Sequence, residues 1–375
     1  MTATQIMPVV RREYAPSRTG LLWRVVVALL LLVVVALLPW ISDTTWNQRI
    51  SLAAIYGIIG LSVNVITGHA GQVSLGHQAF VGIGAFASAF VVSNLGGDFL
   101  AAVVVASLTG AALAVVLGLA ALRVRGLYLA LVTLAFGLTA ETTLFNWRAF
   151  TGGGAGAEAP RPAVLETEMA YAYLCLGALG LVLLLDWRLV KSKAGRAIAA
   201  VRNDERVAAT LGINVTGYKL LAFVVSGFLA GLAGALFAHW NEVVQALDFD
   251  FQVALVWVLM AVVGGLGSRA GVVVASVVFA LLPTVLPTWL EHIPNRPDFL
   301  NDATLHVVTP LIGALLLLLT LTLHPGGIAD QLAPLRRWLA GGPLFPRRRP
   351  VAEPGEQVAG CKPPQTPVPP EEVRS

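Results

Sequence analysis

Six amide and ionisable side chains lie within or beside long apolar runs of this sequence, where they could hydrogen-bond a polar solute. They are Asn64, Gln72, His77, Gln78, Glu141 and Asn146. Such groups are unfavourable inside a bilayer and usually face a bundle interior or a water-filled cavity. We therefore predict that they line a translocation pathway. Two alternatives stay open: Asn64 can equally bridge neighbouring helices, and His69 and His77 can lie solvated at a membrane interface.

The charged stretch 191–217, between two apolar runs, is a second candidate region. Ser192 is a good helix N-cap and Gly212 suits a helix C-terminus, which predicts one amphipathic helix of about four to five turns. Its predicted apolar face consists of Ile198, Val201, Ala208 and Leu211. Its predicted polar face consists of Arg202, Asn203, Asp204 and Glu205.

This amphipathic helix has two interpretations. It either lies on the bilayer surface or docks a soluble partner. Anionic lipid would repel the adjacent carboxylates of Asp204 and Glu205. Because of that repulsion, docking is the favoured interpretation.

The elements that must position these residues are membrane helices. The chain is 57% hydrophobic and 12% charged, whereas a soluble domain carries about 25% charged residues. A bilayer core needs about 20 apolar residues per helix. Ten segments qualify, roughly 21–41, 50–67, 73–94, 98–122, 127–146, 170–190, 219–238, 251–266, 271–290 and 304–323. The sequence thus predicts an all-α, polytopic bundle, in which the Gly-rich third segment could be broken or re-entrant.

The distribution of basic residues gives this bundle an orientation. With the N-terminus inside and ten alternating spans, 21 of the 25 Lys and Arg residues lie on inside segments and 4 on outside segments. That bias is the one the positive-inside rule predicts. We expect a cytoplasmic segment 1–20, a membrane domain 21–325 and a cytoplasmic, largely disordered tail 326–375. Arg347–Arg349 could contact anionic lipid. Nucleic-acid binding is disfavoured, because the basic residues lie at membrane edges.

Small residues recur where the helices must pack. Gly227, Gly231 and Gly234 follow one another at spacings of four and three, and Gly82 and Gly84 form a similar group. Small faces let membrane helices approach closely. The pattern therefore predicts a tight bundle and identifies no ligand site.

Several chemistries lack their motifs in this sequence. It contains no G-x-x-x-x-G-K-[ST] loop, no H-E-x-x-H and no G-x-S-x-G, the signatures of phosphate binding, zinc proteolysis and the nucleophile elbow. The two cysteines, Cys175 and Cys361, have no spacing that suggests a disulfide framework or a zinc site. We expect no catalytic residue, no metal and no cofactor in this chain.

Segments in a fixed order carry a family resemblance. They are Gly68–Phe80, Leu127–Gly137, Thr151–Gly153, Lys191–Asn214 read on through Tyr218–His239, Val263–Ser268 and His324–Gly327. Together, over about residues 50–330, they resemble the inner-membrane permeases of the branched-chain amino acid ABC transporter family, in its LivM-like branch. One such match would carry little weight, but the series is specific.

The resemblance implies a mechanism and partners. In this family, the helix in the charged stretch is a coupling helix that seats in a groove of a cytoplasmic ATPase. The residues carried over to that role are Gly195, Arg196, Ala200, Arg202, Asp204 and Glu205. The implied partners are two ABC ATPase subunits that hold ATP and magnesium, a second homologous permease, an extracytoplasmic solute-binding protein and membrane lipid. The implied location is the bacterial inner membrane.

The implied function is import of a small solute, with branched-chain or related amino acids favoured; relatives of this type also carry urea and short amides. Two departures from the family pattern, Leu138 after Phe136-Gly137 and Thr284 after Leu282-Pro283, bear on the solute. One alternative is a secondary transporter or channel, which should show paired charges at mid-membrane. Another is an intramembrane enzyme, which would bring Ser74, His77 and Glu141 together.

Overall fold

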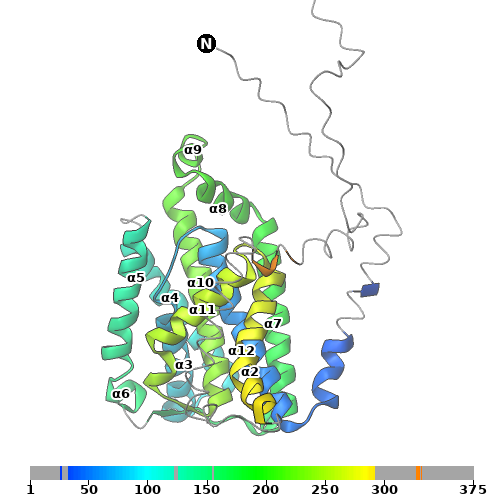
Figure 1. The fold of residues 1–375 in the computed structure, drawn as a ribbon. Helices are drawn as coiled ribbons and strands as arrows, with labels where there is room; N and C mark the ends of the chain where they lie inside the picture. Colours follow the sequence, from blue (N-terminus) through cyan, green and yellow to red (C-terminus); the bar gives the residue numbers. More distant parts are fainter. Residues whose placement is uncertain are drawn as a thin grey trace, which may run out of the picture.

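The computed structural model describes residues 26–27, 33–121, 126–153, 156–291, 327–329 and 331. These residues form a bundle of long helices lying side by side, with two short helices, α8 (Lys193–Asn203) and α9 (Glu205–Thr210), projecting beyond one end (Figure 1). We refer to this as the α8–α9 end and to the other as the opposite end.

The long helices of the bundle alternate in direction between these two ends. They are α2 (Thr44–Val63), α3 (His77–Leu95), α4 (Phe99–Ala121), α5 (Leu127–Thr139), α7 (Glu168–Lys191), α10 (Val215–Asn241), α11 (Phe251–Gly264) and α12 (Arg269–Glu291). Two π-helical turns extend them, η1 (Asn64–His69) after α2 and η2 (Ala140–Leu144) after α5.

Short elements close the opposite end of the bundle. They are α6 (Arg148–Thr151), the 3-10 turns η4 (Ala163–Leu165) and η5 (Ala246–Phe249), and the strands β1 (Ala157–Glu158) and β2 (Val243–Val244). The strands pair antiparallel, with Ala157 opposite Val244. This pairing joins the connection before α7 to the connection after α10.

The predicted spans agree with the helices over most of the chain. Among the described residues, six helices are long and apolar enough to cross a membrane, and 128–144 and 269–285 form two shorter apolar helices. Residues 33–41 of the first predicted span are helical, and the last, 304–323, lies outside the described residues. The count of ten therefore stays a prediction. The third predicted span is the unbroken helix α3, and the irregular backbone is confined to residues 70–76 before it.

Helix α2 is the centre of the bundle. The most apolar stretch of α2–η1 is 89% buried, and α7, α10, α11 and α12 all contact α2. Ile55, Ile58 and Ile59 are completely buried. Gly60 allows α12 to approach, since a Cβ there would lie 2.3 Å from the Ser276 hydroxyl oxygen. The core is thus built around a helix that has almost no lipid-facing surface.

Helices α3, α4 and α10 pack through the predicted small faces. A Cβ on Gly84 would lie 2.5 Å from the Cα of Gly231, and one on Gly227 would lie 2.5 Å from the Gly110 carbonyl oxygen. These distances leave no room for a side chain between the backbones. The prediction of a tight, small-residue bundle is confirmed for this part of the chain.

The predicted terminal segments are mostly outside the described residues, including all of 1–20, Arg347–Arg349 and Cys361. Gly327 is described and has a positive φ of 69°. A Cβ there would lie 2.5 Å from the Val263 carbonyl oxygen, so this residue packs against the turn between α11 and α12. The domain boundaries at 20 and 325 stay predictions.

Candidate functional site

The charged stretch at the α8–α9 end forms two helices, so the prediction of one continuous helix is wrong. The predicted start is confirmed, because the Ser192 hydroxyl accepts a hydrogen bond from the Gly195 amide at 3.1 Å. The predicted end also holds, since Gly212 follows α9 with a φ of 77°. Between them, α8 ends at Asn203 and α9 begins at Glu205.

Asp204 is the cause of the break. Its backbone is extended, with φ −158° and ψ 115°. Its carboxylate accepts hydrogen bonds from the amides of Arg206 at 2.8 Å and Val207 at 3.1 Å. An aspartate in this geometry is an N-cap. The Asp204 side chain therefore starts a second helix and is not a free surface charge.

The predicted apolar face of this stretch is buried except at its end. Ile198, Val201 and Ala208 are at most 3% exposed, as the predicted apolar face requires. Leu211, predicted on the same face, is 72% exposed, because α9 ends at Thr210 and Leu211 lies beyond its last turn. Val207, about one helical turn before Leu211, is 55% exposed. The tip of α9 thus presents two large apolar side chains.

Three contacts hold α8 and α9 against the bundle. A Cβ on Gly195 would lie 2.2 Å from a carbonyl oxygen of α7. Arg202 donates a hydrogen bond from Nη1 to the Gly68 carbonyl oxygen in η1. Glu205 forms an ion pair with Lys219 of α10, at 2.5 Å. Arg202 and Glu205 therefore contact the bundle, while Arg202, Asn203 and Asp204 of the predicted polar face remain exposed.

The other residues predicted for coupling have no side-chain hydrogen bond or ion pair to η1 or α10 among the described residues, although Arg202 is exposed, as Arg196 is. Arg196 and Asp204 are exposed, and Ala200 is half-buried. Arg196 donates from Nη1 to the Lys191 carbonyl oxygen at 2.9 Å. Gly195, Arg202 and Glu205 thus anchor the two helices to the bundle, and a partner could reach the exposed Arg196, Arg202 and Asp204. Their coupling role stays a prediction.

A buried carboxylate that the sequence analysis missed lies near this end. Asp186 of α7 has a fully buried side chain. Its Oδ1 lies 3.1 Å from His69 Nε2 in η1, and its Oδ2 accepts a hydrogen bond from Arg269 Nε at the start of α12. An acidic residue inside an apolar run is a signal for a functional or pairing role. That signal was present in the sequence at residue 186.

His77 and Gln78, two predicted pathway residues, lie together at the start of α3. Both are completely buried, so the solvated alternative does not hold for His77. His77 Nε2 lies 2.7 Å from Ser62 Oγ. Neither polar atom of the Gln78 amide has a hydrogen-bond partner among the described residues. Buried polar atoms without partners are uncommon and call for an explanation.

The contact between Ser62 and His77 does not support an enzyme. The Ser62 hydroxyl donates to the Ile59 carbonyl oxygen at 2.7 Å, so it accepts from His77, whose Nε2 then carries the proton. A histidine that donates to a serine cannot act as its general base. Glu141 lies in η2, and neither its Oε2 nor the Ser74 hydroxyl has a hydrogen-bond partner among the described residues.

The remaining pathway candidates make no hydrogen bond to the side chains of His77 or Gln78 among the described residues. Asn64 Oδ1 accepts from the Gly267 amide at 2.8 Å, which is the helix-bridging alternative. Gln72 is half-buried in the irregular segment 70–76. Asn146 is exposed and donates to the Glu141 carbonyl oxygen at 2.9 Å. The described hydrogen bonds therefore do not join the six side chains, and their role in a translocation pathway stays a prediction.

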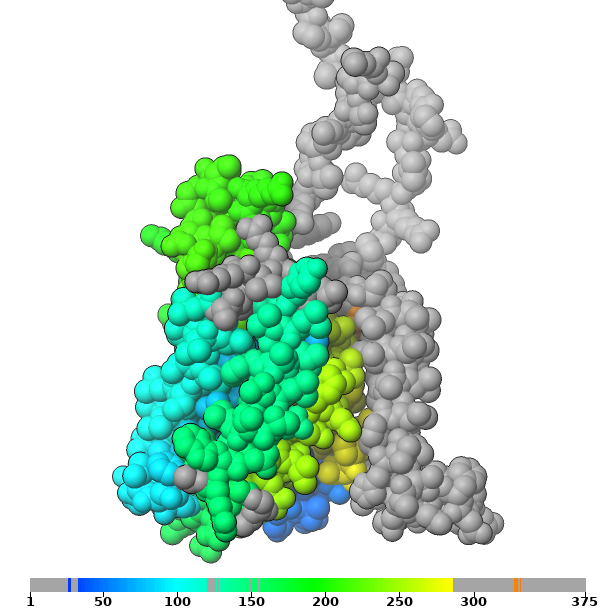
Figure 2. All heavy atoms as spheres, turned by 90° about the vertical axis from the view of Figure 1, so that its left-hand side faces the viewer, coloured from blue at the N-terminus to red at the C-terminus, as the bar shows by residue number. Residues whose placement is uncertain are grey.

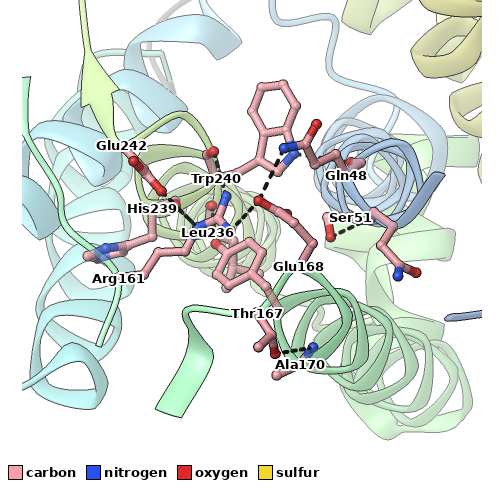
Figure 3. A network of polar contacts seen from close by, with 12 residues as sticks. Gln48, Ser51, Arg161, Thr167, Glu168, Ala170, Leu236, His239, Trp240 and Glu242 are labelled. Atoms are coloured by element: carbon pink, nitrogen blue, oxygen red, sulfur yellow. Dashed lines mark hydrogen bonds and ion pairs between the residues drawn. The ribbon is translucent and has the colours of Figure 1, made fainter. Parts of the chain in front are cut away.

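A polar network fixes the opposite end (Figure 3). Arg161, which is 5% exposed at its side chain, donates to the carbonyl oxygens of His239 at 2.7 Å and Trp240 at 2.9 Å. It also pairs with Glu168 at 2.8 Å and lies over the Tyr171 ring at 4.5 Å. Arg161 thus caps the end of α10 and ties it to the start of α7.

Helical spans, apolar composition and a polar unit outside the bundle define a polytopic membrane protein. The chain belongs to the family described as the permease component of branched-chain amino acid transport systems, which matches residues 47–321. This membership confirms the resemblance found in the sequence.

Individual relatives agree with that membership. The high-affinity branched-chain amino acid transport system permease protein LivM of Salmonella typhimurium is 32% identical over 290 residues, covering 70% of this chain and 68% of LivM. LivM of Escherichia coli is 33% identical with the same coverage. The permease LivH of Escherichia coli is 22% identical over 270 residues, covering 64% of this chain and 85% of LivH. No solved structure matches the chain.

Proposed function

We propose that the chain is the membrane-spanning permease subunit of an ATP-driven importer that brings a branched-chain or related amino acid into the cytoplasm. Family membership supports the transport class, and the names of the LivM relatives support the solute class. In this proposal the chain lies in a bacterial inner membrane with ten spans. Both termini and the α8–α9 end face the cytoplasm, which agrees with the positive-inside rule.

The observation that carries the proposal is the projecting α8–α9 unit (Figure 1). Its contacts to η1, which extends α2, and to α7 and α10 hold it firmly against the bundle. Its tip exposes Val207 and Leu211, apolar side chains suited to anchoring in a partner's groove. The partner we assign to this tip is an ATPase subunit, one of two that hold ATP and magnesium.

The second permease and the solute-binding protein complete the importer. Helix α5 and η2 lie on the outer face of the bundle, below α8 and α9 in the space-filling view (Figure 2). Thr139, Thr142, Thr143 and Asn146 are exposed on this element. Each of these side chains bonds a carbonyl oxygen of its own helix, so a protein neighbour could cover this face without leaving a polar group unpaired. We place the second permease against this face and the solute-binding protein at the opposite end.

Co-purification tests the docking tip. In a variant with Val207→Asp and Leu211→Asp, we expect the ATPase-to-permease ratio of the purified complex to fall at least about tenfold, because each buried anchor contributes about 2 kcal/mol or more. Both positions are exposed in the chain, so the variant should fold normally. The measurement is quantitative mass spectrometry of the complex purified from native membranes.

The matched control carries two aspartates at the opposite end. Val164 and Leu247 are 85% and 79% exposed there, and Val164→Asp with Leu247→Asp should leave the ATPase bound. If the native chain purifies without any ATPase, the importer assignment fails and a transporter acting alone becomes the better account. Equal retention of ATPase by both variants would instead remove α9 as the docking tip.

A second prediction concerns the buried amide of Gln78. Replacing it with leucine removes two buried polar atoms that have no partner among the described residues. Such a replacement is neutral or raises stability by about 1 kcal/mol, because an unsatisfied buried amide is destabilising. If the amide binds the passing solute, leucine uptake into proteoliposomes should fall sharply while the melting temperature holds or rises.

The control for this test is Gln48→Leu. Gln48 is exposed at the opposite end, and its amide donates to Glu168 at 3.2 Å. We expect native uptake from it. Undiminished uptake by the Gln78→Leu complex would show that this amide is not on the solute route.

A further inference from the structure

The π turn η1 is the point of the bundle where the projecting helices meet the core. A π turn inserts one extra residue into a helix and is frequent at functional sites. Its wide bonding is visible at the Ala70 amide, which bonds the Val65 carbonyl oxygen at 3.2 Å. The Gly68 carbonyl oxygen accepts from Arg202 of α8. The projecting helix is therefore bonded directly to the backbone of this turn.

The same turn is bonded to α7 and α12 through the buried Asp186. His69, the last residue of η1, contacts Oδ1 of Asp186, and Arg269 of α12 donates to Oδ2. A fully buried carboxylate is stable only when it is paired and hydrogen-bonded. Moving η1 without α7 and α12 would expose or unpair this charge. The three elements are thus electrostatically constrained to move together.

A third attachment joins η1 to the turn between α11 and α12. Asn64 Oδ1 accepts from the Gly267 amide at 2.8 Å. A Cβ on Gly68 would lie 2.1 Å from Asn64 Oδ1 and 2.6 Å from the Gly267 nitrogen. The two backbones therefore lie close together at Gly68, beside the Asn64 amide that joins them.

Helix α8 crosses a hollow between its attachments to the core. The hollow has a volume of about 110 Å³, with Val65 and His69 on one wall and Ile198 and Ala199 on the other. At one end of α8, Gly195 touches α7; at the other, Arg202 bonds η1. The hollow leaves free space beside α8, and between its two ends Ile198 packs against Ala70 and Ala222 in a small cluster that would have to move with the helix.

We propose that η1 is the joint through which movement of α8 and α9 reaches α2 and α12 and stays coupled to α7, which continues directly into α8 at Ser192. Its positioning residues are Arg202, His69 and Asp186. This inference rests on the proposed importer function, in which ATP drives that movement. Polar bonds suit such a joint, because they can hold the projecting helices to η1 while both move as one unit. Arg202 is then a mechanical link inside the permease and not a contact to the ATPase.

An engineered disulfide can replace the proposed link. A Cβ on Gly71, two residues beyond η1, would lie 3.8 Å from the Cβ of Arg202, the separation typical of disulfides. The test uses the complete complex with Cys361→Ser, and the remaining Cys175 is buried. It compares Arg202→Cys alone with the pair Gly71→Cys and Arg202→Cys, each oxidised and then reduced. Gly71→Cys alone accounts for the strain of a side chain at the positive φ of 69°.

The measured quantity is labelled leucine taken up per ATP hydrolysed. Arg202→Cys should lower it about tenfold with the ATPase still bound, the factor that loss of one charge-assisted hydrogen bond corresponds to. The oxidised pair should regain native coupling, and reduction should abolish it again. Hydrogen exchange in complexes trapped with ATP and vanadate gives a second, solute-independent result: in Arg202→Cys the change should stay confined to α8 and α9.

Two results would overturn the joint. Native coupling in Arg202→Cys would show that the link carries no movement. Oxidation that blocks uptake or fails to restore it would show that the contact has to break during the cycle. Both are distinct from failure of the importer assignment, in which no ATPase is bound to the native complex.

A second variant tests the buried carboxylate. Asp186→Asn keeps the side-chain volume and weakens both of its charged contacts, so it should uncouple the complex in the same direction as Arg202→Cys. Glu166→Gln, an exposed carboxylate at the opposite end, is its control and should couple normally. Native coupling in Asp186→Asn would remove α7 and α12 from the joint.

Discussion

Substituting valine for Gly231 is expected to prevent the bundle from assembling. A Cβ at this position would lie 2.3 Å from the Ala106 carbonyl oxygen and 3.1 Å from the Cα of Ser107, both in α4. On the other side, a Cβ on Gly84 of α3 would already be 2.5 Å from the Gly231 Cα. All of these obstacles are backbone atoms, so no rotamer change can relieve the clash.

The expected destabilisation follows from that geometry. Overpacking among side chains costs about 1–3 kcal/mol, because neighbouring side chains can partly adjust. Here two helices must separate, and we expect a loss above about 4 kcal/mol, a large part of the 5–15 kcal/mol typical of a folded domain. The measurement is the monodisperse fraction in detergent by size-exclusion chromatography, together with the melting temperature of whatever remains.

Helix α7 offers a matched control. Gly177 and Gly180 lie in a long helix of the same bundle, and a Cβ at either would meet nothing within 4 Å. Valine at these positions should change stability by about 0.5 kcal/mol or less. A Gly231→Val protein that elutes and melts like the Gly180→Val protein would contradict the close contact of α3, α4 and α10.

The sequence predicted this packing because its cause is local. Glycines three and four residues apart share one helix face whatever the rest of the fold does, as Gly227 and Gly231 do. Apolar runs likewise predict membrane-length helices without knowledge of their neighbours. The Ser192 cap and the Gly212 terminus were predictable for the same reason.

The break between α8 and α9 was not predicted, because the hydrophobic period runs through it. Ile198, Val201 and Ala208 are all buried, so the apolar pattern alone is consistent with one helix. Asp204 can end one helix and cap the next, but aspartate also occurs within helices, so its presence alone does not predict a break. The apolar pattern predicted that Leu211 is buried, whereas it is exposed beyond the end of α9.

The links of the proposed joint needed the structure for a different reason. Arg202 and Gly68 are 134 residues apart, and Asp186 is 117 residues from His69. A sequence can indicate that a buried acid needs a partner, but it does not indicate which of many basic residues lies within reach. For the same reason, the sequence could not predict the partners of the pathway residues: His77 contacts Ser62, and Asn64 contacts Gly267.

Replacing Arg161 is expected to cause the second largest loss of stability. Arg161→Met keeps the apolar stem but leaves the Glu168 carboxylate, 16% exposed, without its charged partner. It also leaves the carbonyl oxygens of His239 and Trp240 without a donor (Figure 3). Breaking a buried ion pair on one side destabilises by about 3–5 kcal/mol. We expect a loss of about 3 kcal/mol, because the pair is not fully buried, measured by unfolding in mixed micelles.

The lysine variant separates charge from geometry at this position. Arg161 directs three different nitrogens to Glu168 and to the two carbonyl oxygens that end α10. A lysine ammonium retains the charge but lacks this planar fork, so Arg161→Lys should recover less than half of the lost stability. Arg148→Met, at an exposed arginine of the same end, should be nearly neutral. Full rescue of stability by lysine would mean that α10 needs only a positive charge near its C-terminus. The contacts of the connection before α7 and the β1–β2 pairing would then be enough to hold this end together.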